Sequence, residues 1–527
     1  MADYGDIVFS LPSVSKTQGQ KTINFYREDM VTHTIMAGTV GSGKSQIILR
    51  LLRQIFKRIA RGSNDVVVLT DSGGEFTKVF FDENHCHMLN PLDIRSQTWD
   101  LFSELVDPVT DSRMLAENMV QEDPNPKNKV WTDYARTLLS SCMHVVKRDL
   151  VTKKLQGVDP VDYLITMLNE FSKEQLEGEL TGTPAMGILK GKETEGLAIT
   201  RSTLMPTLES LALFKGQGNF SIRTWLSNVL SQENSNNEKR VLFIPYMDLH
   251  MSILKNTIGA WLNLVSKQVM SSGASRERTV WVICDELDSL GKVSSLEEML
   301  ARGRKYGFNF LGAIQSVGQL RKTYGRESAQ TILSTTNTKI ILKQGSFEDA
   351  DYWSKDIGDH LAKKKSAGMS AGKDVSLSSN VSTQREALIP ASDFRQVEKF
   401  GAFILKNSSP GKIIRYRSAG PFVLEDIAPT FIEKQKRTYE TEFASQVEEN
   451  VVEQREKEED DDEDSTSEGS VDESPEKDFD PEKDSDSKGS FEEYRRERDQ
   501  IQEEEKEEKK KIEIREDKED MSGLYDI

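Results

Sequence analysis

Residues 38–45 read Gly38-Thr39-Val40-Gly41-Ser42-Gly43-Lys44-Ser45. An apolar stretch, Thr34 to Ala37, comes before them, and a helical pattern of apolar residues begins at Gln46. A glycine-rich loop between a strand and a helix turns its backbone N–H groups and the positive end of the helix toward an anion. In this motif the lysine reaches the β- and γ-phosphates of a nucleotide, and the last hydroxyl binds Mg²⁺. The stretch therefore predicts a nucleotide-binding loop, with Lys44 at the phosphates and Ser45 at Mg²⁺.

A pair of carboxylates follows a second predicted strand. Residues 280–284 are apolar and lead directly into Asp285 and Glu286. Hydrolysis of a nucleotide needs a carboxylate that holds the metal and a base for the attacking water. We expect Asp285 to bind Mg²⁺ and Glu286 to polarise the water. A single apolar strand that ends in an acidic turn is common, so this prediction depends on residues 38–45 being present earlier in the chain.

Two further polar side chains are candidates for the same site. Gln315 follows the apolar run that starts at Phe308, and it would lie beside the γ-phosphate if that strand neighbours the other two. Arg304 lies in the basic run 301–307, at the end of the helix that follows the acidic pair. In ring-shaped ATPases an arginine of the next subunit stabilises the transferred charge. The simpler alternatives are a polar strand end for Gln315 and a favourable helix C-terminus for Arg304.

The charge of the chain is concentrated at one end. The 527 residues carry a formal net charge of −18, and residues 431–527 alone hold 38 acidic against 17 basic side chains. The remainder is almost neutral, so the acidity of the whole chain does not exclude a nucleic acid as partner. Three cysteines without a Cys-x-x-Cys spacing suit a reducing compartment and predict a cytoplasmic location. No apolar run of 18 residues predicts a membrane span, and the N-terminus lacks the regions of a secretory signal.

Strand-length apolar runs alternate with helical patterns on both sides of a helical region, which predicts one α/β sheet interrupted by an insert. Residues 362–384, rich in Lys, Ser and Gly, are expected to form an extended hairpin or a mobile loop. The charged, low-complexity C-terminal region cannot bury enough apolar area to fold and is predicted to be disordered. The predicted parts are a lead-in with edge strands (1–29), a nucleotide-binding α/β domain in two pieces (30–103 and 216–430), an inserted all-α domain (104–215) and an acidic tail (431–527).

Several ordered motifs together resemble the type IV secretion, or conjugative, coupling proteins, in particular their TraD branch. The resemblance covers about residues 30–425. The matching segments are residues 38–45, Leu89-Asn90-Pro91-Leu92-Asp93-Ile94-Arg95 with Trp99 and Phe102, Phe220 to Leu226, Cys284-Asp285-Glu286-Leu287, Ala301 to Gly307, and Ile314-Gln315-Ser316 with Gln319-Leu320 and Tyr324-Gly325.

This resemblance implies a RecA-like P-loop NTPase with an inserted all-α domain, assembled into hexameric rings. It implies ATP and Mg²⁺ as ligands and ATP-driven movement of single-stranded DNA, or of a relaxase-DNA complex, to a secretion channel at the cytoplasmic face of the inner membrane. The acidic tail is similar to the extension through which such proteins dock the relaxosome, and Leu524 to Ile527 would provide an apolar contact. Members normally carry two transmembrane helices before the motor. Because this chain begins almost at the motor, we expect that its anchor is lost or separately encoded, with membrane association through a partner, or that the reading frame is a shortened relic.

Three alternatives remain open from the sequence. A DNA translocase of the FtsK or HerA kind shares the core motifs, although the helical insert and the Asn90 to Trp99 segment speak against it. A substrate adaptor whose motor no longer hydrolyses ATP would act through the helical domain and the tail. The tail itself would in the simplest case only keep the chain soluble.

Overall fold

The computed structural model describes residues 6–15, 19–122, 126–190, 194–216, 218–231, 239–371, 375–418 and 420–434. The predicted acidic tail lies outside the described residues from position 435 onward.

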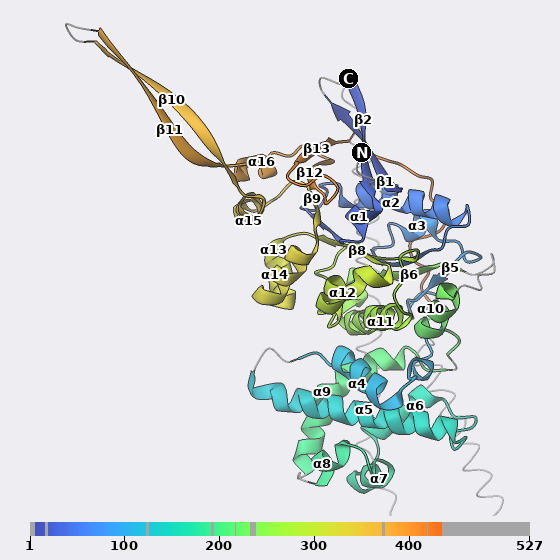
Figure 1. Ribbon diagram of the computed structural model, residues 1–527. Helices are drawn as coiled ribbons and strands as arrows, with labels where there is room; N and C mark the ends of the chain where they lie inside the picture. The colour runs from blue at the N-terminus through green and yellow to red at the C-terminus, as the bar shows by residue number, and fades with distance from the viewer. Residues whose placement is uncertain are drawn as a thin grey trace, which may run out of the picture. The chain divides into compact units, whose positions relative to one another are not determined.

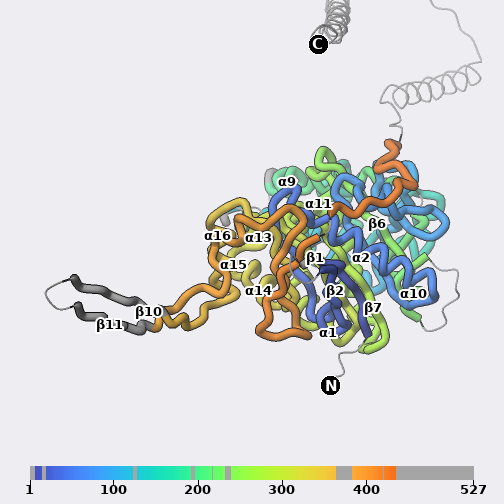
Figure 2. Tube along the Cα trace, turned by 90° about the horizontal axis from the view of Figure 1, so that it is seen from above, coloured from blue at the N-terminus to red at the C-terminus, as the bar shows by residue number. Residues whose placement is uncertain are grey.

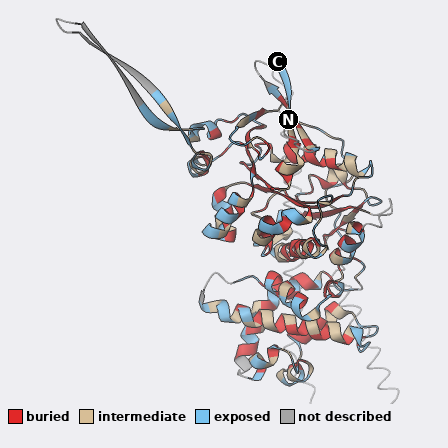
Figure 3. Cartoon of the chain, viewed as in Figure 1, coloured by how far each residue is buried: buried red, intermediate tan, exposed pale blue. Residues whose placement is uncertain are grey.

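A nine-stranded sheet forms the centre of the described chain (Figure 1), in the order β13-β12-β9-β3-β8-β7-β4-β6-β5. The strands from β9 to β5 are parallel to one another, and β12 and β13 are antiparallel additions at one edge. All residues of β3 and β8 are buried, as expected for parallel strands covered by helices on both faces (Figure 3). The strands of this sheet are β3 (Thr34–Ala37), β4 (Asp65–Ser72), β5 (Cys86–Met88), β6 (Val241–Tyr246), β7 (Thr279–Cys284), β8 (Phe308–Ile314), β9 (Thr338–Ile341), β12 (Gly401–Leu405) and β13 (Ile414–Arg417).

The helices that accompany the sheet come from both sides of the insert in the sequence. They include α2, whose apolar residues from Ile47 to Ile55 pack into a core shared with the two N-terminal strands and one face of the sheet. They are α1 (Arg27–Met30), α2 (Lys44–Ile59), α3 (Thr77–Phe80), α10 (Ile222–Leu230), η3 (Asp248–His250), α11 (Met251–Ser271), α12 (Leu296–Arg302), η4 (Gly303–Tyr306), α13 (Val317–Tyr324), α14 (Arg326–Thr335), α15 (Phe347–Ile357) and α16 (Ala391–Arg395).

The N-terminal segment differs from the prediction of edge strands. Strands β1 (Ile7–Ser15) and β2 (Gly19–Tyr26) pair with each other in a separate antiparallel sheet and do not join the nine-stranded sheet. Their buried Phe9, Leu11 and Phe25 pack onto the core around α2. The side chain of Gln54 on α2 also accepts from the Ser10 amide and donates to its carbonyl, both at 3.0 Å. Burial against a helix, and not pairing with a sheet edge, therefore keeps this hairpin in position.

All the elements that the structure describes from η1 to α9 are helices. Aspartates whose side chains accept from backbone amides cap the N-termini of α4 and α6, and each is followed by a proline that suits the first helical turn. Helix α5 contributes a continuous buried face, including Leu138, Leu139 and Val146. The elements are η1 (Phe102–Glu104), α4 (Pro108–Met119), η2 (Pro126–Asn128), α5 (Lys129–Val151), α6 (Pro160–Asn169), α7 (Lys173–Glu179), α8 (Ala185–Lys190) and α9 (Thr194–Ala212).

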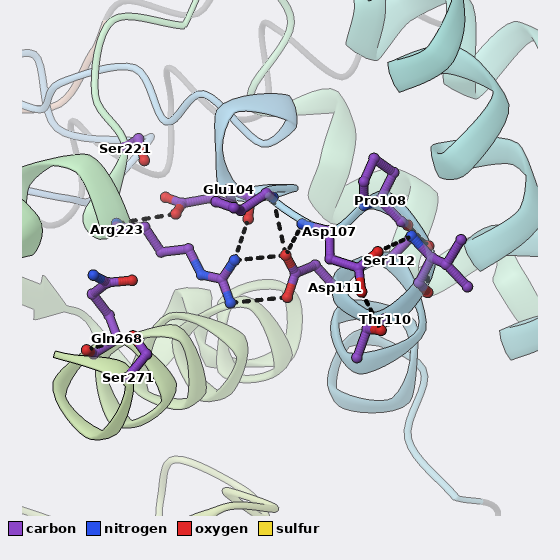
Figure 4. A network of polar contacts seen from close by, with 12 residues as sticks. Glu104, Asp107, Pro108, Thr110, Asp111, Ser112, Ser221, Arg223, Gln268 and Ser271 are labelled. Carbon is purple, nitrogen blue, oxygen red and sulfur yellow. Dashed lines mark hydrogen bonds and ion pairs between the residues drawn. The ribbon is translucent and has the colours of Figure 1, made fainter. Parts of the chain in front are cut away.

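A buried polar network joins the start of these helices to α10, where the chain returns (Figure 4). The Arg223 guanidinium forms a two-pronged ion pair with Asp111, at 2.6 and 2.8 Å, and both side chains are largely buried. The Glu104 carboxylate accepts from the backbone amides of Ile222 and Arg223 and from the Trp99 indole. Burial raises the pKa of Glu104, and these hydrogen bonds oppose that rise. The network ties together two chain segments more than 100 positions apart.

The segment 362–384 belongs to an extended hairpin, which was one of the two predicted alternatives. Strands β10 (Asp359–Ala371) and β11 (Val375–Ala387) are paired in register from Asp359 with Ala387 to Ala371 with Val375. They form a two-stranded sheet of their own beside α15 and α16 (Figure 1).

The last described segment, residues 420–434, crosses from the β13 edge of the sheet toward β5 and β6 (orange in Figure 2). The amide of Ile427 donates to the Lys78 carbonyl at 2.7 Å, and the amide of Lys434 donates to the Leu92 carbonyl at 2.8 Å. The Ile432 amide donates to the Asp93 carboxylate. The first four residues of the predicted tail, 431–434, are thus ordered against the α/β domain. None of the helices in the described part of the chain is long and apolar enough to cross a membrane.

Candidate nucleotide site

The loop 38–45 joins β3 to α2 at the carboxyl end of the sheet. Gly41 and Gly43 have φ of 71° and 113°, values that side chains disfavour. A Cβ at Gly38 would lie 2.7 Å from Ser42 Oγ, and one at Gly43 would lie 2.8 Å from the Phe400 ring. Ser42 Oγ is buried and has no hydrogen-bond partner. The glycines therefore shape a compact cradle that retains an unused polar group, as a phosphate site requires.

Lys44 begins α2 and lies half-buried. Its Nζ donates a hydrogen bond to the Gly38 carbonyl at 2.6 Å. Burial lowers the pKa of Lys44, and the carboxylates of Glu286, Asp288 and Asp285 raise it in that order. The predicted lysine and both predicted carboxylates therefore interact electrostatically, although more than 200 residues separate them in the sequence.

Asp285 follows the last residue of β7. Its Oδ2 accepts from the Ser72 amide at 2.8 Å, whereas its buried Oδ1 has no partner. Burial raises the pKa of Asp285 well above its usual range, and the neighbouring Asp71 raises it further. An unpaired carboxylate oxygen beside a phosphate cradle suits a magnesium ion, because Mg²⁺ prefers oxygen ligands and its charge would stabilise the ionised carboxylate.

Glu286 and Gln315 meet because β7 and β8 are neighbours. Gln315 Nε2 donates a hydrogen bond to Glu286 Oε1. Strand β8 lies between β3 and β7, so Gln315 leaves the sheet between the loop 38–45 and the acidic pair. This is the neighbour relation on which the prediction for Gln315 depended.

The position of Arg304 differs from that of the other predicted residues. It is exposed in η4, which precedes β8, whereas Lys44 follows β3. Since β3 and β8 are parallel, Arg304 lies at the amino ends of the strands, whereas Lys44 of the same chain lies at their carboxyl ends. It lines a cavity of about 800 Å³ whose charged residues are Arg27, Glu28, Arg276, Arg302, Arg304 and Lys305. The structure thus brings together Lys44, Asp285, Glu286 and Gln315 but not Arg304.

Two acidic residues of the site were not singled out from the sequence. Buried Asp71, at the end of β4, accepts from the amides of Phe76 and Thr77 and from the Thr77 hydroxyl. Burial raises its pKa to about 6. Asp288 has two buried carboxylate oxygens without partners, and burial followed by the charge of Glu286 raises its pKa to about 6. The available signals were a carboxylate at the end of another apolar strand for Asp71, and the spacing of three residues from Asp285 for Asp288.

The described residues provide no group of three or more His, Cys, Asp or Glu side chains that could hold a metal ion by themselves. A magnesium ion at Asp285 would therefore need other oxygen ligands, and the predicted set of Ser45 and bound phosphates is of the right chemical kind. The cradle, the unpaired Asp285 oxygen and the lysine together fit a magnesium nucleotide.

Comparison with known proteins identifies the family. Residues 20–413 match the family model described as type IV secretion-system coupling protein DNA-binding domain. The chain is 29% identical over 389 residues to the coupling protein TraD of Escherichia coli (strain K12), covering 72% of this chain and 51% of that protein. It is 24% identical over 362 residues to the type IV secretion system-coupling protein VirD4 of Bartonella quintana (strain Toulouse), covering 63% of this chain and 54% of that protein. The chain spans about half the length of the curated relatives it matches.

Solved structures show the same fold. The plasmid coupling protein TrwB in complex with ADP and Mg²⁺ aligns with a TM-score of 0.65 at 24% identity, over 78% of this chain and 91% of that chain. TrwB in complex with a non-hydrolysable ATP analogue aligns with a TM-score of 0.65 at 23% identity, over 82% of this chain and 93% of that chain. These likenesses confirm the predicted RecA-like P-loop NTPase fold. With the family match over most of the chain, they lead to one conclusion: the chain belongs to the type IV secretion-system coupling proteins, the family that includes TraD and VirD4.

Proposed function

We propose that this chain is an ATP-hydrolysing motor that moves single-stranded DNA, with its bound relaxase, toward a type IV secretion channel during conjugation. The observation that carries the proposal is the convergence of Lys44, Glu286 and Gln315 at the ends of three adjacent strands. A lysine for phosphates, a carboxylate for water and an amide that holds the carboxylate are groups that support phosphoryl transfer to water. Membership of the coupling-protein family supports DNA and a secretion channel as partners.

Each residue has a distinct task in this proposal. Lys44 leaves the Gly38 carbonyl to reach the β- and γ-phosphates, and Ser42 and the loop amides hold the phosphate oxygens. Ser45 and Asp285 hold Mg²⁺, which would neutralise charge that develops on the phosphates. Glu286 takes a proton from the attacking water. Gln315 orients the Glu286 carboxylate and changes its contacts when the γ-phosphate leaves.

We assign Arg304 to the nucleotide site of the next subunit in a homohexameric ring. Its exposed position at the amino ends of the strands prevents it from reaching the site of its own chain, and it leaves the side chain free to act on a neighbour. The basic cavity around it would present several cations to the phosphates of that neighbour. Such an arginine contributes about 10³ to 10⁵ in rate, so an isolated subunit would be nearly inactive.

The helical residues 104–215 and the acidic tail are proposed to receive the relaxase and relaxosome proteins, while residues 30–103 and 216–430 form the motor. We place the protein at the cytoplasmic face of the inner membrane, where a partner would provide contact with the channel. These assignments rest on the family and on the charge of the tail, which attracts basic partners.

The deciding experiment measures phosphate release from MgATP by the purified chain, with and without single-stranded DNA, at concentrations that allow rings to form. We expect turnover that increases with DNA and is lost in Lys44→Ala. Lys215→Ala, a surface lysine in the helical insert, serves as the matched control. Nucleotide binding without any turnover sensitive to Lys44→Ala would show a non-hydrolysing adaptor instead.

A further inference from the structure

The catalytic loop, residues 287–295, connects Glu286 to α12. The motor holds it from one side. Ser289 Oγ lies 2.8 Å from the Tyr246 hydroxyl, and the Thr323 hydroxyl donates to the Asp288 carbonyl at 3.3 Å. The Val293 amide donates to the Tyr324 hydroxyl at 3.4 Å. The Leu287 amide also donates to the Ala313 carbonyl at 2.8 Å, and Leu287, Leu290 and Val293 are buried. The motor therefore fixes the apolar residues of the loop, while the polar residues between them are held by long hydrogen bonds or by other parts of the chain.

The inserted helical domain holds the same loop from the other side, through the end of α4. Ser294 Oγ donates to Asn118 Oδ1 at 2.8 Å. Asn118 is buried, and its Nδ2 donates to the Met114 carbonyl at 2.7 Å, which fixes the amide so that Oδ1 faces the loop. A Cβ added at Gly291, where φ is 74°, would lie 2.9 Å from Gln121 Nε2. The helical domain therefore forms a hydrogen bond to the loop eight residues after Glu286 and approaches it closely five residues after Glu286.

The end of α4 is itself attached to three other helices. The Met119 carbonyl accepts from the Thr207 hydroxyl on α9 and from the Asn256 amide on α11, both at 3.1 Å. The Val120 carbonyl accepts from Arg136 Nε on α5 at 2.9 Å. Movement of any of these helices would thus displace the contacts at Asn118 and Gln121.

A cavity of about 1200 Å³ lies beside these contacts, between the insert and the motor. Asn118 and Gln121 line it from the insert, and Glu286 and Asp288 line it from the motor. The open space leaves the loop room to shift when α4 shifts, and a shift of the loop would move the carboxylate at its start.

We propose that Asn118 and Gln121 are positioning residues for hydrolysis. They hold the catalytic loop in the place that aligns Glu286 with the attacking water, and they connect the rate of hydrolysis to the state of the helical domain. This inference rests on the proposed function, because it concerns the same nucleotide site. It adds a route by which a substrate bound to the helical domain acts on catalysis.

The first test compares Asn118→Ala with Thr110→Ala, which removes an exposed side-chain hydrogen bond at the other end of α4. We expect Asn118→Ala to lower kcat roughly 2- to 10-fold, the equivalent of one neutral hydrogen bond, with an unchanged KM for ATP. Ser294→Ala should have the same effect, and the double variant should lose no more than either single one. Equal kcat in Asn118→Ala and Thr110→Ala would overturn the inference.

A second variant pair separates the contact from backbone strain. Gly291→Ala carries both the strain of positive φ and the clash with Gln121, whereas Gln121→Ala in the same chain removes the clash alone. Partial recovery of kcat in the double variant is expected, and no recovery would contradict a role for Gln121.

Hydrogen exchange of residues 287–295 provides a readout that does not need turnover. Exchange should be faster in Asn118→Ala than in the wild-type chain or Thr110→Ala. If the wild-type chain shows no hydrolysis, the proposed function fails while this exchange difference still tests the contact. An unchanged exchange rate would overturn the positioning role in either case.

Discussion

Gln315 donates a hydrogen bond from Nε2 to Oε1 of Glu286, a residue 29 positions earlier in the chain. The two side chains meet because Cys284 near the end of β7 is paired with Gly312 near the end of β8. The strand β8 also borders β3, which leads into Lys44. One hydrogen bond thus connects the carboxylate that would activate water with the strand next to the phosphate loop.

This contact predicts different effects for its two partners. Glu286→Gln should lower phosphate release by about 10²-fold or more, because the proton acceptor is lost. Gln315→Ala should lower it by about 10- to 100-fold, because the carboxylate remains but is no longer oriented. Both variants should still bind MgATP, as measured by calorimetry. Normal turnover in Glu286→Gln would remove this residue from the mechanism.

Arg304 and Lys44 lie at opposite ends of two neighbouring parallel strands, so a shared site requires two chains. We expect Arg304→Ala and Lys44→Ala to be nearly inactive when each is assayed alone. Mixed in equal amounts, they should regain part of the activity, since some interfaces then pair an intact Lys44 with an intact Arg304. Phosphate release across a series of mixing ratios measures this. Absence of rescue at every ratio, with rings formed, argues against the assignment.

The buried ion pair between Arg223 and Asp111 predicts a loss of stability. Arg223→Ala leaves the Asp111 carboxylate buried without its partner, which should lower the free energy of unfolding by about 3 kcal/mol. Arg113→Ala breaks the exposed pair with Glu117 and should change it by less than about 0.5 kcal/mol. Urea unfolding of the three proteins tests this. Equal stability of the two variants would show that the network is not important for the fold.

Asp288 predicts a pH dependence of stability. Its pKa is raised to about 6 in the folded chain, so between about pH 4 and pH 6 the folded state binds more protons than the unfolded state. The stabilisation is complete below about pH 4 and is lost as the pH rises through 6. Asp288→Asn should remove this part of the slope and exceed the wild-type stability at pH 8 by roughly 2 kcal/mol. Urea unfolding of the nucleotide-free proteins from pH 4 to pH 8 measures the difference, and parallel curves would contradict it.

The acidic tail predicts a separation of recruitment from catalysis. Because residues 431–434 contact the motor, truncation should follow Lys436 and not Thr430. The truncated chain should keep its basal ATP hydrolysis but recover less relaxosome in a pull-down. A chain whose tail has the same composition in scrambled order separates docking from a general effect of charge. Full recovery by the truncated chain would reject docking through the tail.

Local sequence was sufficient for the phosphate loop and for the strands of the motor. The glycines of 38–45 impose a loop conformation within eight residues, and apolar runs such as those before Asp285 and Gln315 lead to buried strands in most surroundings. The family followed from such motifs taken together. The pairing of β1 with β2 was not predictable in this way, because the choice between a sheet edge and a helix surface depends on residues such as Gln54 that lie elsewhere in the chain.

Amino-acid order alone thus specified an α/β fold with a phosphate-binding loop, since its motifs act through residues adjacent in the chain. Strand order and helix packing decided that Gln315 touches Glu286, that Asp71 and Asp288 share the site, that Arg304 faces away from it, and that Asn118 reaches the catalytic loop. These relations join residues far apart in the chain. Their distances arise only when the apolar faces of many elements are buried together, and no local pattern encodes that arrangement.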